Sequence, residues 1–178
     1  MSQASLKCSV RFTVLFASML LISLFIAKSA SADETHKFSN GVSFSYPSGY
    51  QKQEANQAPV STVSFVSASD PAVTLMVSLI EGGAAGNNTI PDTIDESVYK
   101  SSLPEGSELI AYKKITVGGK DALLIEVSTE QQGMHIFSRS VSIASGQDML
   151  SVVGTSMDKN KIDAVRKTAE SIEASIKF

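Results

Sequence analysis

Apolar and polar residues alternate over short segments through most of the chain, and this two-residue period is typical of strands with one buried face. The pattern predicts seven strands, at 42–46, 62–65, 73–79, 109–117, 122–128, 134–144 and 149–155. In the third strand, Met76 and Ile80 add apolar side chains on the second face, which indicates a central strand covered on both sides. The last four strands predict an antiparallel meander, because only short turns containing glycine or glutamine separate them.

Two segments are predicted to be helical. The last one has apolar residues at steps of three and four, and begins near Ser156 or Asp158, whose side chains suit a helix cap. Its apolar stripe comprises Ile162, Val165, Ala169, Ile172 and Ile176. The other follows the polar stretch 81–91, with Thr93 and Glu96 at capping-box spacing and Ile94 and Val98 on one face. The elements together predict an α+β fold, an antiparallel sheet of six to seven strands flanked by helices as an α/β/α sandwich.

Residues 1–32 have the pattern of a secretory signal peptide. Lys7 and Arg11 precede an uncharged, largely apolar run over 12–27, and Ala30-Ser31-Ala32 supplies the small residues that a signal peptidase requires. The apolar run is shorter than the roughly 20 residues of a membrane-spanning helix, so cleavage after Ala32 is the favoured interpretation. An uncleaved N-terminal anchor remains the alternative. The prediction is a single domain over 33–178, located in the periplasm or outside the cell.

The composition narrows the possible functions. The chain has 178 residues with 15 Lys and Arg against 18 Asp and Glu. Residues 1–32 contain three of the bases and no acid, so the remainder is acidic, and a nucleic-acid partner is not expected. The one cysteine, Cys8, lies in the predicted signal peptide, which leaves neither a disulfide nor a thiolate site after cleavage. His36 and His135 are the two imidazoles, and no metal-ligand spacing surrounds them, so neither metal nor cofactor is predicted.

Three segments carry a resemblance to a known family. The opening FSNGVSFSYPSGY at 38–50, the VGGKDA hairpin at 117–122 and the closing EASIKF at 173–178 resemble, in order and spacing, those of PsbP-like and DcrB-like proteins. The resemblance implies an antiparallel sheet between helices, a fold also seen in a yeast nuclear Ran-binding protein. It further implies a binding or accessory protein, since the family has no shared catalytic set. Tyr50 stands where the family often has tryptophan, and no lipid-attachment cysteine follows the apolar run, so a photosystem role is not implied.

A candidate polar site comes from the expected strand registers. If Gln131 and Gln132 form a two-residue turn, Leu124 lies opposite Arg139, and Glu126 becomes a diagonal neighbour of Arg139 near His135. A turn at Gly146-Gln147 places Gly154 opposite Arg139 and leaves room above it. Glu126, His135 and Arg139 are therefore candidate residues for binding an anion or a small molecule. The alternative is a structural Glu–Arg pair at a sheet edge or under the helix.

Catalytic motifs are weak by comparison. Ser97 and Lys100 have S-x-x-K spacing, but the companion motifs of penicillin-recognising enzymes are absent from the sequence, so a cryptic hydrolase is the most remote hypothesis. No catalytic residues are predicted, and the chain is not expected to be an enzyme. The leading hypothesis is a non-enzymatic module that docks onto a protein partner or an envelope complex. The docking surface could be a serine-rich sheet face, which carries Ser138, Ser140, Ser142, Ser151 and Thr155.

Overall fold

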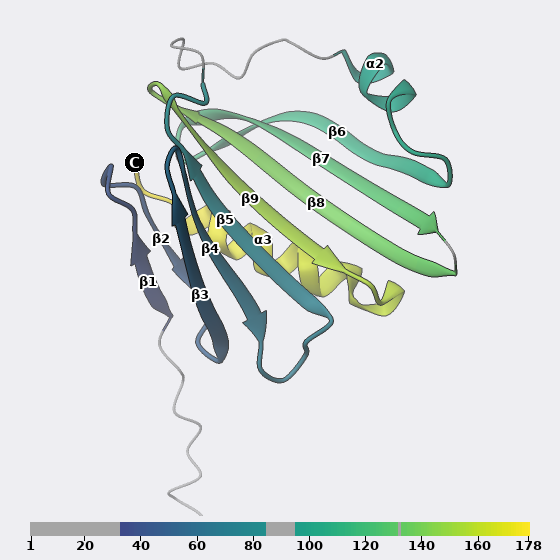
Figure 1. Cartoon of the computed structure of the whole chain (residues 1–178), viewed down its shortest axis with the longest axis horizontal. Helices are drawn as coiled ribbons and strands as arrows, with labels where there is room; N and C mark the ends of the chain where they lie inside the picture. Colours follow the sequence, from purple (N-terminus) through teal and green to yellow (C-terminus); the bar gives the residue numbers. More distant parts are fainter. Residues whose placement is uncertain (1–32, 85–94, 132) are drawn as a thin grey trace, which may run out of the picture. The chain divides into compact units, whose positions relative to one another are not determined.

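The larger part of the fold is a seven-stranded antiparallel sheet with the order β3-β4-β5-β9-β8-β7-β6 (Figure 1). The computed structural model describes residues 33–84, 95–131 and 133–178. The predicted signal peptide and its cleavage site lie outside these residues. The strands of the large sheet are β3 (Tyr50–Gln57), β4 (Val60–Ser67), β5 (Val73–Ile80), β6 (Ser107–Val117), β7 (Lys120–Gln131), β8 (Met134–Ser145) and β9 (Asp148–Ser156).

A second sheet and the helices complete the described part of the chain. β1 (Glu34–Lys37) and β2 (Ser43–Tyr46) form a two-stranded sheet. Ser43 and Lys177 exchange backbone hydrogen bonds of 3.0 and 2.8 Å, so the C-terminal segment pairs with β2. The helices are α2 (Glu96–Ser101), the short 3₁₀ helix η1 (Lys159–Lys161) and α3 (Ile162–Ser175). None of the described helices is long and apolar enough to cross a lipid bilayer.

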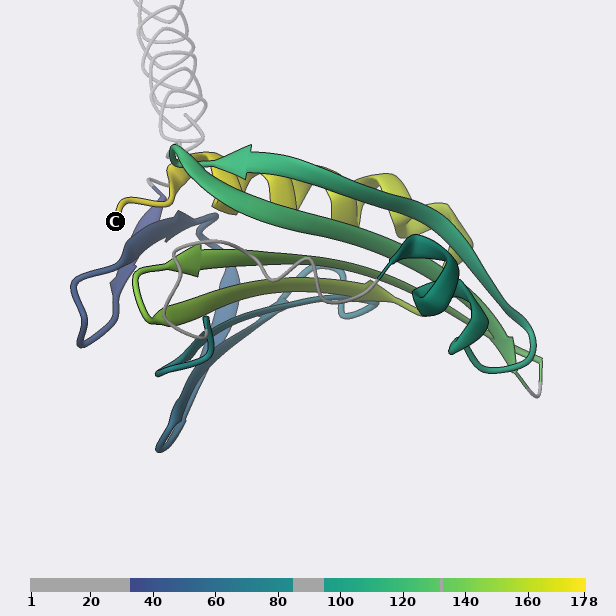
Figure 2. The same ribbon diagram turned by 90° about the horizontal axis from the view of Figure 1, so that it is seen from above.

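α3 lies along one face of the large sheet and packs on β9, β5, β8 and β2 (Figures 1 and 2). The predicted apolar stripe is confirmed, because Val165, Ala169 and Ile172 are completely buried. Asp158 caps η1, where its carboxylate accepts a hydrogen bond from the Asn160 backbone N–H at 2.9 Å. Beneath α3 the strands contribute alternate apolar side chains. The core includes Phe44, Phe65, Leu75, Val77, Leu79, Val141, Ile143, Leu150 and Val152.

The opposite face of the sheet is only partly covered. Met76 on the central strand β5 is 37% exposed, so the prediction that this strand is covered on both sides is wrong at that position. Among the described residues, α2 lies on this side near one edge, where the rings of Tyr99 and Tyr112 are 5.8 Å apart (Figure 2). Helices therefore flank both faces as predicted, but with very unequal coverage. The α+β fold class is confirmed.

The strand composition of the sheet differs from the prediction in two places. The segment around Phe44 is a strand, but it pairs with β1 in the small sheet instead of joining the large one. The seventh strand of the large sheet is β3, which the hydrophobic pattern did not detect. Seven of its eight residues are exposed, so neither face of the strand has a row of buried apolar side chains. An edge strand with no buried face has no alternation for a pattern to detect.

The β7–β8 register also differs. The prediction placed Leu124 opposite Arg139, whereas the structure pairs Leu124 with Val141 and Glu126 with Arg139. The shift has a local cause: β7 ends at Gln131, which pairs with Met134, so the turn contains Gly133 instead of being formed by Gln131 and Gln132. Gly133 has φ +78°, and tight hairpin turns require such positive φ values, which glycine adopts without strain.

The start of α2 is a further correction. Asp95 is its N-cap, since the carboxylate accepts a hydrogen bond from the Ser97 backbone N–H at 2.7 Å. The predicted cap, Thr93, and its neighbour Ile94 lie outside the described residues. Val98, which was expected on a buried face, is 58% exposed. α2 is thus a short, mostly solvated helix.

Candidate functional site

Two of the three candidate residues meet at the centre of the sheet face that α3 covers. Glu126 on β7 and Arg139 on β8 are directly opposite each other, and Gly154 on β9 lies opposite Arg139, as predicted. The expected room above Gly154 is filled by α3. A Cβ atom on Gly154 would lie 2.7 Å from Cγ1 of Val165, so the absence of a side chain brings the helix close to the sheet.

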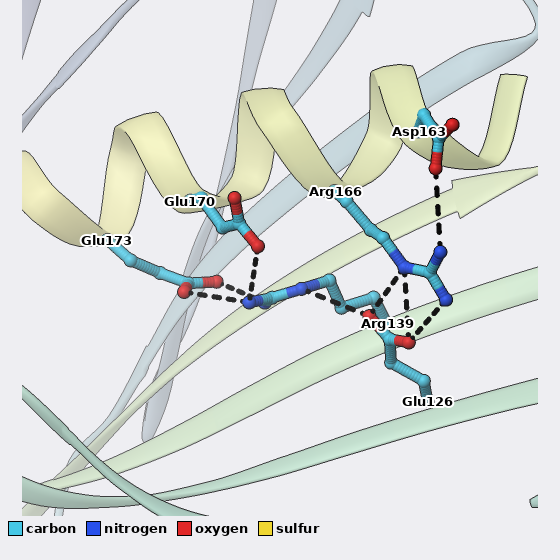
Figure 3. A network of polar contacts seen from close by, with 6 residues as sticks. All are labelled: Glu126, Arg139, Asp163, Arg166, Glu170 and Glu173. Carbon is cyan, nitrogen blue, oxygen red and sulfur yellow. Dashed lines mark hydrogen bonds and ion pairs between the residues drawn. The ribbon is translucent and has the colours of Figure 1, made fainter. Parts of the chain in front are cut away.

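Arg139 is held by a residue that the sequence analysis did not single out. Its Nη1 and Nη2 donate to the two carboxylate oxygens of Glu173 on α3, the second at 3.1 Å (Figure 3). The Arg139 Nε lies 3.4 Å from Glu126 Oε1. Arg139 is 3% exposed, and Glu126 and Glu173 are each 6% exposed. The guanidinium thus has a carboxylate on either side in a nearly dry interface.

Arg166, seven residues before Glu173 on α3, is the fourth residue of the cluster. Its Nη2 donates to Glu126 Oε2 at 2.7 Å, and its Nε lies 3.1 Å from Glu126 Oε1 (Figure 3). The guanidinium also lies over the Phe137 ring at 5.3 Å. Two arginines and two glutamates therefore balance in charge, and we call Glu126, Arg139, Arg166 and Glu173 the Arg–Glu cluster.

The charges of the cluster are paired with each other, as in an ion-pair network that stabilises a fold. Burial raises the pKa of Glu173 above its usual range, and the hydrogen-bonded Arg139 guanidinium opposes that effect. The hydrogen bonds to Glu126 raise the pKa of Arg166. Each charged group is matched by an opposite charge, as burial of ions requires. The cluster ties α3 to β7 and β8, and the structural Glu–Arg pair weighed in the sequence analysis describes this geometry.

Arg166 and Glu173 could have been found from the sequence. Arg166 and Glu173 are seven residues apart, which is two helical turns, so they lie on the same side of α3. Both border the apolar stripe that packs on the sheet. A charged residue at the border of a buried stripe needs a partner on the opposing element. The strand residues Glu126 and Arg139 offered such partners, but the expected register hid the match.

His135 lies apart from the cluster. It is four residues before Arg139 on β8, roughly 13 Å along the strand, and pairs with Glu130. Its Nδ1 lies 2.9 Å from Glu130 Oε1, which also forms an ion pair with Lys159 Nζ at 2.5 Å. The hydrogen bonds from Lys159 and His135 lower the pKa of Glu130. The three predicted site residues are therefore not brought together, and their binding role stays a prediction.

An open depression of about 480 Å³ lies beside His135 and is lined by residues 133–135 and 157–160. The His135 Nε2 is buried and has no hydrogen-bond partner among the described residues. No group of three or more histidine, cysteine or acidic side chains in the described part of the chain could hold a metal ion.

Ser97 and Lys100 lie on α2 without a shared site. The Ser97 hydroxyl donates to the capping carboxylate of Asp95 at 2.6 Å, so it belongs to the helix cap. This hydrogen bond explains the serine by local structure.

The predicted serine-rich face is present in the structure, on the side of the sheet opposite α3. Ser142 pairs with Ser151, and Ser138 pairs with Thr155, so the five predicted hydroxyl residues share one face. The surface continues onto β5 and β4, where the hydroxyls of Ser78 and Thr62 are hydrogen-bonded at 2.9 Å. We call this surface the open face, and it comprises Thr62, Ser64, Met76, Ser138, Ser140, Ser142, Ser151, Val153 and Thr155, whereas Ser78 is buried.

Comparisons with known proteins give a match at the level of structure. No family model and no curated sequence matches the chain. Cyanobacterial PsbP (CyanoP) from Synechocystis sp. PCC 6803 is similar with a TM-score of 0.54 and 14% identity, over 85% of this chain and 95% of that protein. LpqN from Mycobacterium tuberculosis, described as involved in cell envelope biogenesis, has a TM-score of 0.53 and 14% identity, over 82% and 89%.

The immunity protein TplEi of Pseudomonas aeruginosa, in complex with a peptide, is similar with a TM-score of 0.50 and 11% identity, over 90% of this chain and 83% of that one. The chain spans 44% of a longer matched chain from Bacteroides thetaiotaomicron. The TM-scores show a shared fold, and with identities this low the similarity shows nothing finer than the fold. The sequence resemblance to the PsbP-like fold is confirmed in that sense.

Proposed function

We propose that this chain, which has the PsbP-like fold, is an exported non-enzymatic binding protein that docks a protein partner on its open face. The partner would belong to the cell envelope or the secreted proteins, in keeping with the signal-peptide pattern of residues 1–32. The fold neighbours LpqN, described as an envelope-biogenesis protein, and TplEi, which binds a peptide, support a role of this class.

The observation that carries the proposal is the unequal coverage of the two sheet faces. α3 buries one face, whereas Met76 of the interior strand β5 is 37% exposed on the other. The open face combines hydroxyls with short apolar side chains and has no Lys, Arg, Asp or Glu in its central rows. An uncharged surface of this kind suits the core of a protein interface, where charged residues are depleted.

The chemistry of the charged residues agrees with a non-catalytic role. Arg139 and Glu173 are bound to each other beneath α3, and Ser97 belongs to the cap of α2. Such groups hold the fold in place. The open face is then the surface that we propose for docking, and a partner would gain from covering Met76 and Val153.

Photocrosslinking tests the proposal directly. A photoreactive amino acid at Ser142, on the β8 side of the open face, should crosslink to one protein partner in cells that express the full-length chain. The same amino acid at Ser171, exposed on the outer surface of α3, is the matched control and should give no such product. A second variant, Ser140→Arg, should abolish the Ser142 crosslink while leaving the thermal unfolding temperature unchanged.

Two results would contradict the proposal. Equal crosslinking from Ser142 and Ser171 would show that the open face is not selective. Turnover of a defined substrate by the purified protein, lost on a single substitution, would show an enzyme.

A second candidate function is the binding of an anion or small molecule near His135, favoured by the depression and the unpartnered Nε2. A panel of phosphate and carboxylate ligands should then raise the unfolding temperature of the protein, and His135→Ala should remove the effect. Stabilisation that survives both His135→Ala and Arg139→Met would exclude the predicted residues as a binding site.

A further inference from the structure

The outer edge of β3 has no hydrogen-bonded strand beside it among the described residues, although His36 of β1 lies 3.7 Å from the Glu54 carboxylate. β3 lies at one end of the large sheet, and β4 is its one hydrogen-bonded neighbour in the described part of the chain (Figure 1). Seven of its eight residues are exposed, and the strand contains neither proline nor a bulge. Unpaired backbone groups along such an edge are a template for another strand.

The opposite edge of the sheet is different. β6 has a register shift between Leu109 and Ala111, and the intervening Ile110 is 42% exposed. Both edges carry a lysine near the centre of the strand, Lys113 on β6 and Lys52 on β3, so lysine does not distinguish them. The bulge does, because it disrupts the ladder and opposes edge-to-edge pairing. Of the two edges, β3 is therefore the one that remains competent to pair.

The backbone hydrogen bonds show which residues of β3 face outward. Ala68 N–H donates to Gly49 O at 3.1 Å, so these residues form a hydrogen-bonded pair at the end of the β3–β4 ladder. Because such pairs alternate along antiparallel strands, the odd-numbered residues of β3 bond to β4. The N–H and C=O groups of Tyr50, Lys52, Glu54 and Asn56 consequently point away from the sheet.

The sequence of this edge is complementary to itself. An antiparallel pair of two β3 strands with Gln53 opposite Gln53 on the two-fold axis aligns the outward-facing groups of both copies. In that register, Lys52 of each copy lies opposite Glu54 of the other. Lys52 and Glu54 already share one face and form an ion pair of 2.9 Å within the strand. Pairing would convert two such pairs into a ring of four alternating charges.

We propose that a second copy of this chain binds along β3, forming a two-fold symmetric dimer in which the two large sheets continue through a β3–β3 ladder. The ladder satisfies the outward backbone groups, and the Lys52–Glu54 cross-pairs set the register. The interface is short and polar, so the dimer is weak and concentration-dependent. It leaves the open face and its proposed partner site free.

Charge reversal with compensation tests the proposal, using protein purified from cells that express the full-length chain. Sedimentation of the parent protein up to millimolar concentration should show a monomer–dimer equilibrium. Lys52→Glu and Glu54→Lys should each weaken the dimer at least about tenfold, because both cross-pairs become repulsive. An equal mixture of the two variants should regain the parent affinity, since every cross-pair in the heterodimer is again opposite in charge. Lys113→Glu, the same change at the other edge, should have no effect.

Crosslinking fixes the register independently. Gln53→Cys places two cysteines across the axis in a non-hydrogen-bonded pair, where the strands come close enough for a disulfide. It should form disulfide-linked dimers, whereas Gln51→Cys should not, and the parent chain controls for Cys8. A parent protein that stays monomeric, or a dimer insensitive to the charge reversals, would overturn the proposal. Ser140→Arg should leave the dimer intact, which separates this inference from the docking function.

Discussion

Arg139 on β8 and Glu173 on α3 form a bidentate ion pair across the interface between the sheet and the helix, with both side chains almost completely buried. The pair joins residues 34 positions apart in the chain, and Arg139 lies opposite Gly154, where a Cβ atom would lie 2.7 Å from Val165 Cγ1 of the helix. Both desolvation and charge attraction act there. The outcome of removing one partner depends on the charge that is left behind.

Arg139→Met should strongly destabilise the protein. It keeps most of the side-chain volume but leaves Glu173 buried without its cation, and an unpaired buried charge typically costs about 3–5 kcal/mol. Urea unfolding followed by circular dichroism gives the free energy of unfolding. In the double variant Arg139→Met/Glu173→Met the unpaired charge is gone, so much of the lost stability should return. A double variant no more stable than Arg139→Met alone would contradict this explanation.

The raised pKa of Glu173 predicts a specific pH dependence. The folded state binds the Glu173 proton more tightly than the unfolded state, so its contribution to stability is fully present below the unfolded pKa and is lost as pH rises through the raised pKa. The stability of the parent protein relative to Glu173→Gln should therefore fall from acidic to neutral pH. Urea unfolding of both proteins between about pH 4 and pH 7, which starts near the usual carboxyl pKa, measures the difference.

The control for that experiment is Glu105→Gln, which removes one negative charge from an exposed side chain outside the Arg–Glu cluster. It reports the general effect of one charge on the stability of the protein. A stability difference between the parent and Glu173→Gln that is independent of pH, or that rises with pH, would contradict the prediction.

Gly154 should resist even the smallest substitution. In most strands alanine is more stable than glycine, but here the new Cβ would lie 2.7 Å from Val165 Cγ1 and 3.3 Å from Leu75 Cδ2. Overpacking of this kind typically costs about 1–3 kcal/mol, so Gly154→Ala should destabilise the protein. Thermal unfolding measures the effect. Gly154→Ala should cost less when Val165 is also replaced by alanine, and equal costs in both backgrounds would refute the steric explanation.

Much of the fold could be predicted because buried residues recur at the regular spacing of a strand or a helix, and this spacing is visible in the sequence. The stripe of α3 and the buried positions of β5, such as Leu75 and Val77, show that period clearly. The expected glycine turn between β6 and β7 is formed by Gly118 and Gly119, which both have positive φ values. β3 has no such signal, since its residues, such as Gln53, face solvent, and its place is determined by pairing with β4. Edge strands of this kind depend on tertiary context.

The candidate site was only half predictable for a related reason. Glu126 and Arg139 were placed on one face correctly, because that assignment needs only the parity of each strand. Their exact pairing depended on the turn, and the register shift moved Glu126 away from His135, which is four residues from Arg139 in either register. The partner Glu173 lies on a different element, and no local rule fixes how α3 is positioned over the sheet.

The turn that sets this register yields the last prediction. Gly133 has φ +78°, and a Cβ atom built on it meets nothing within 4 Å, so backbone strain alone opposes substitution. A β-branched residue in the left-handed region costs roughly 1–2 kcal/mol, whereas asparagine adopts it more readily. Gly133→Val should therefore lower the free energy of unfolding, and Gly133→Asn should lower it much less. Chemical unfolding of the two variants compares them at the same site. Equal losses for both would mean that side-chain crowding opposes the substitution, which is the situation at Gly154, where the built Cβ lies 2.7 Å from Val165 Cγ1.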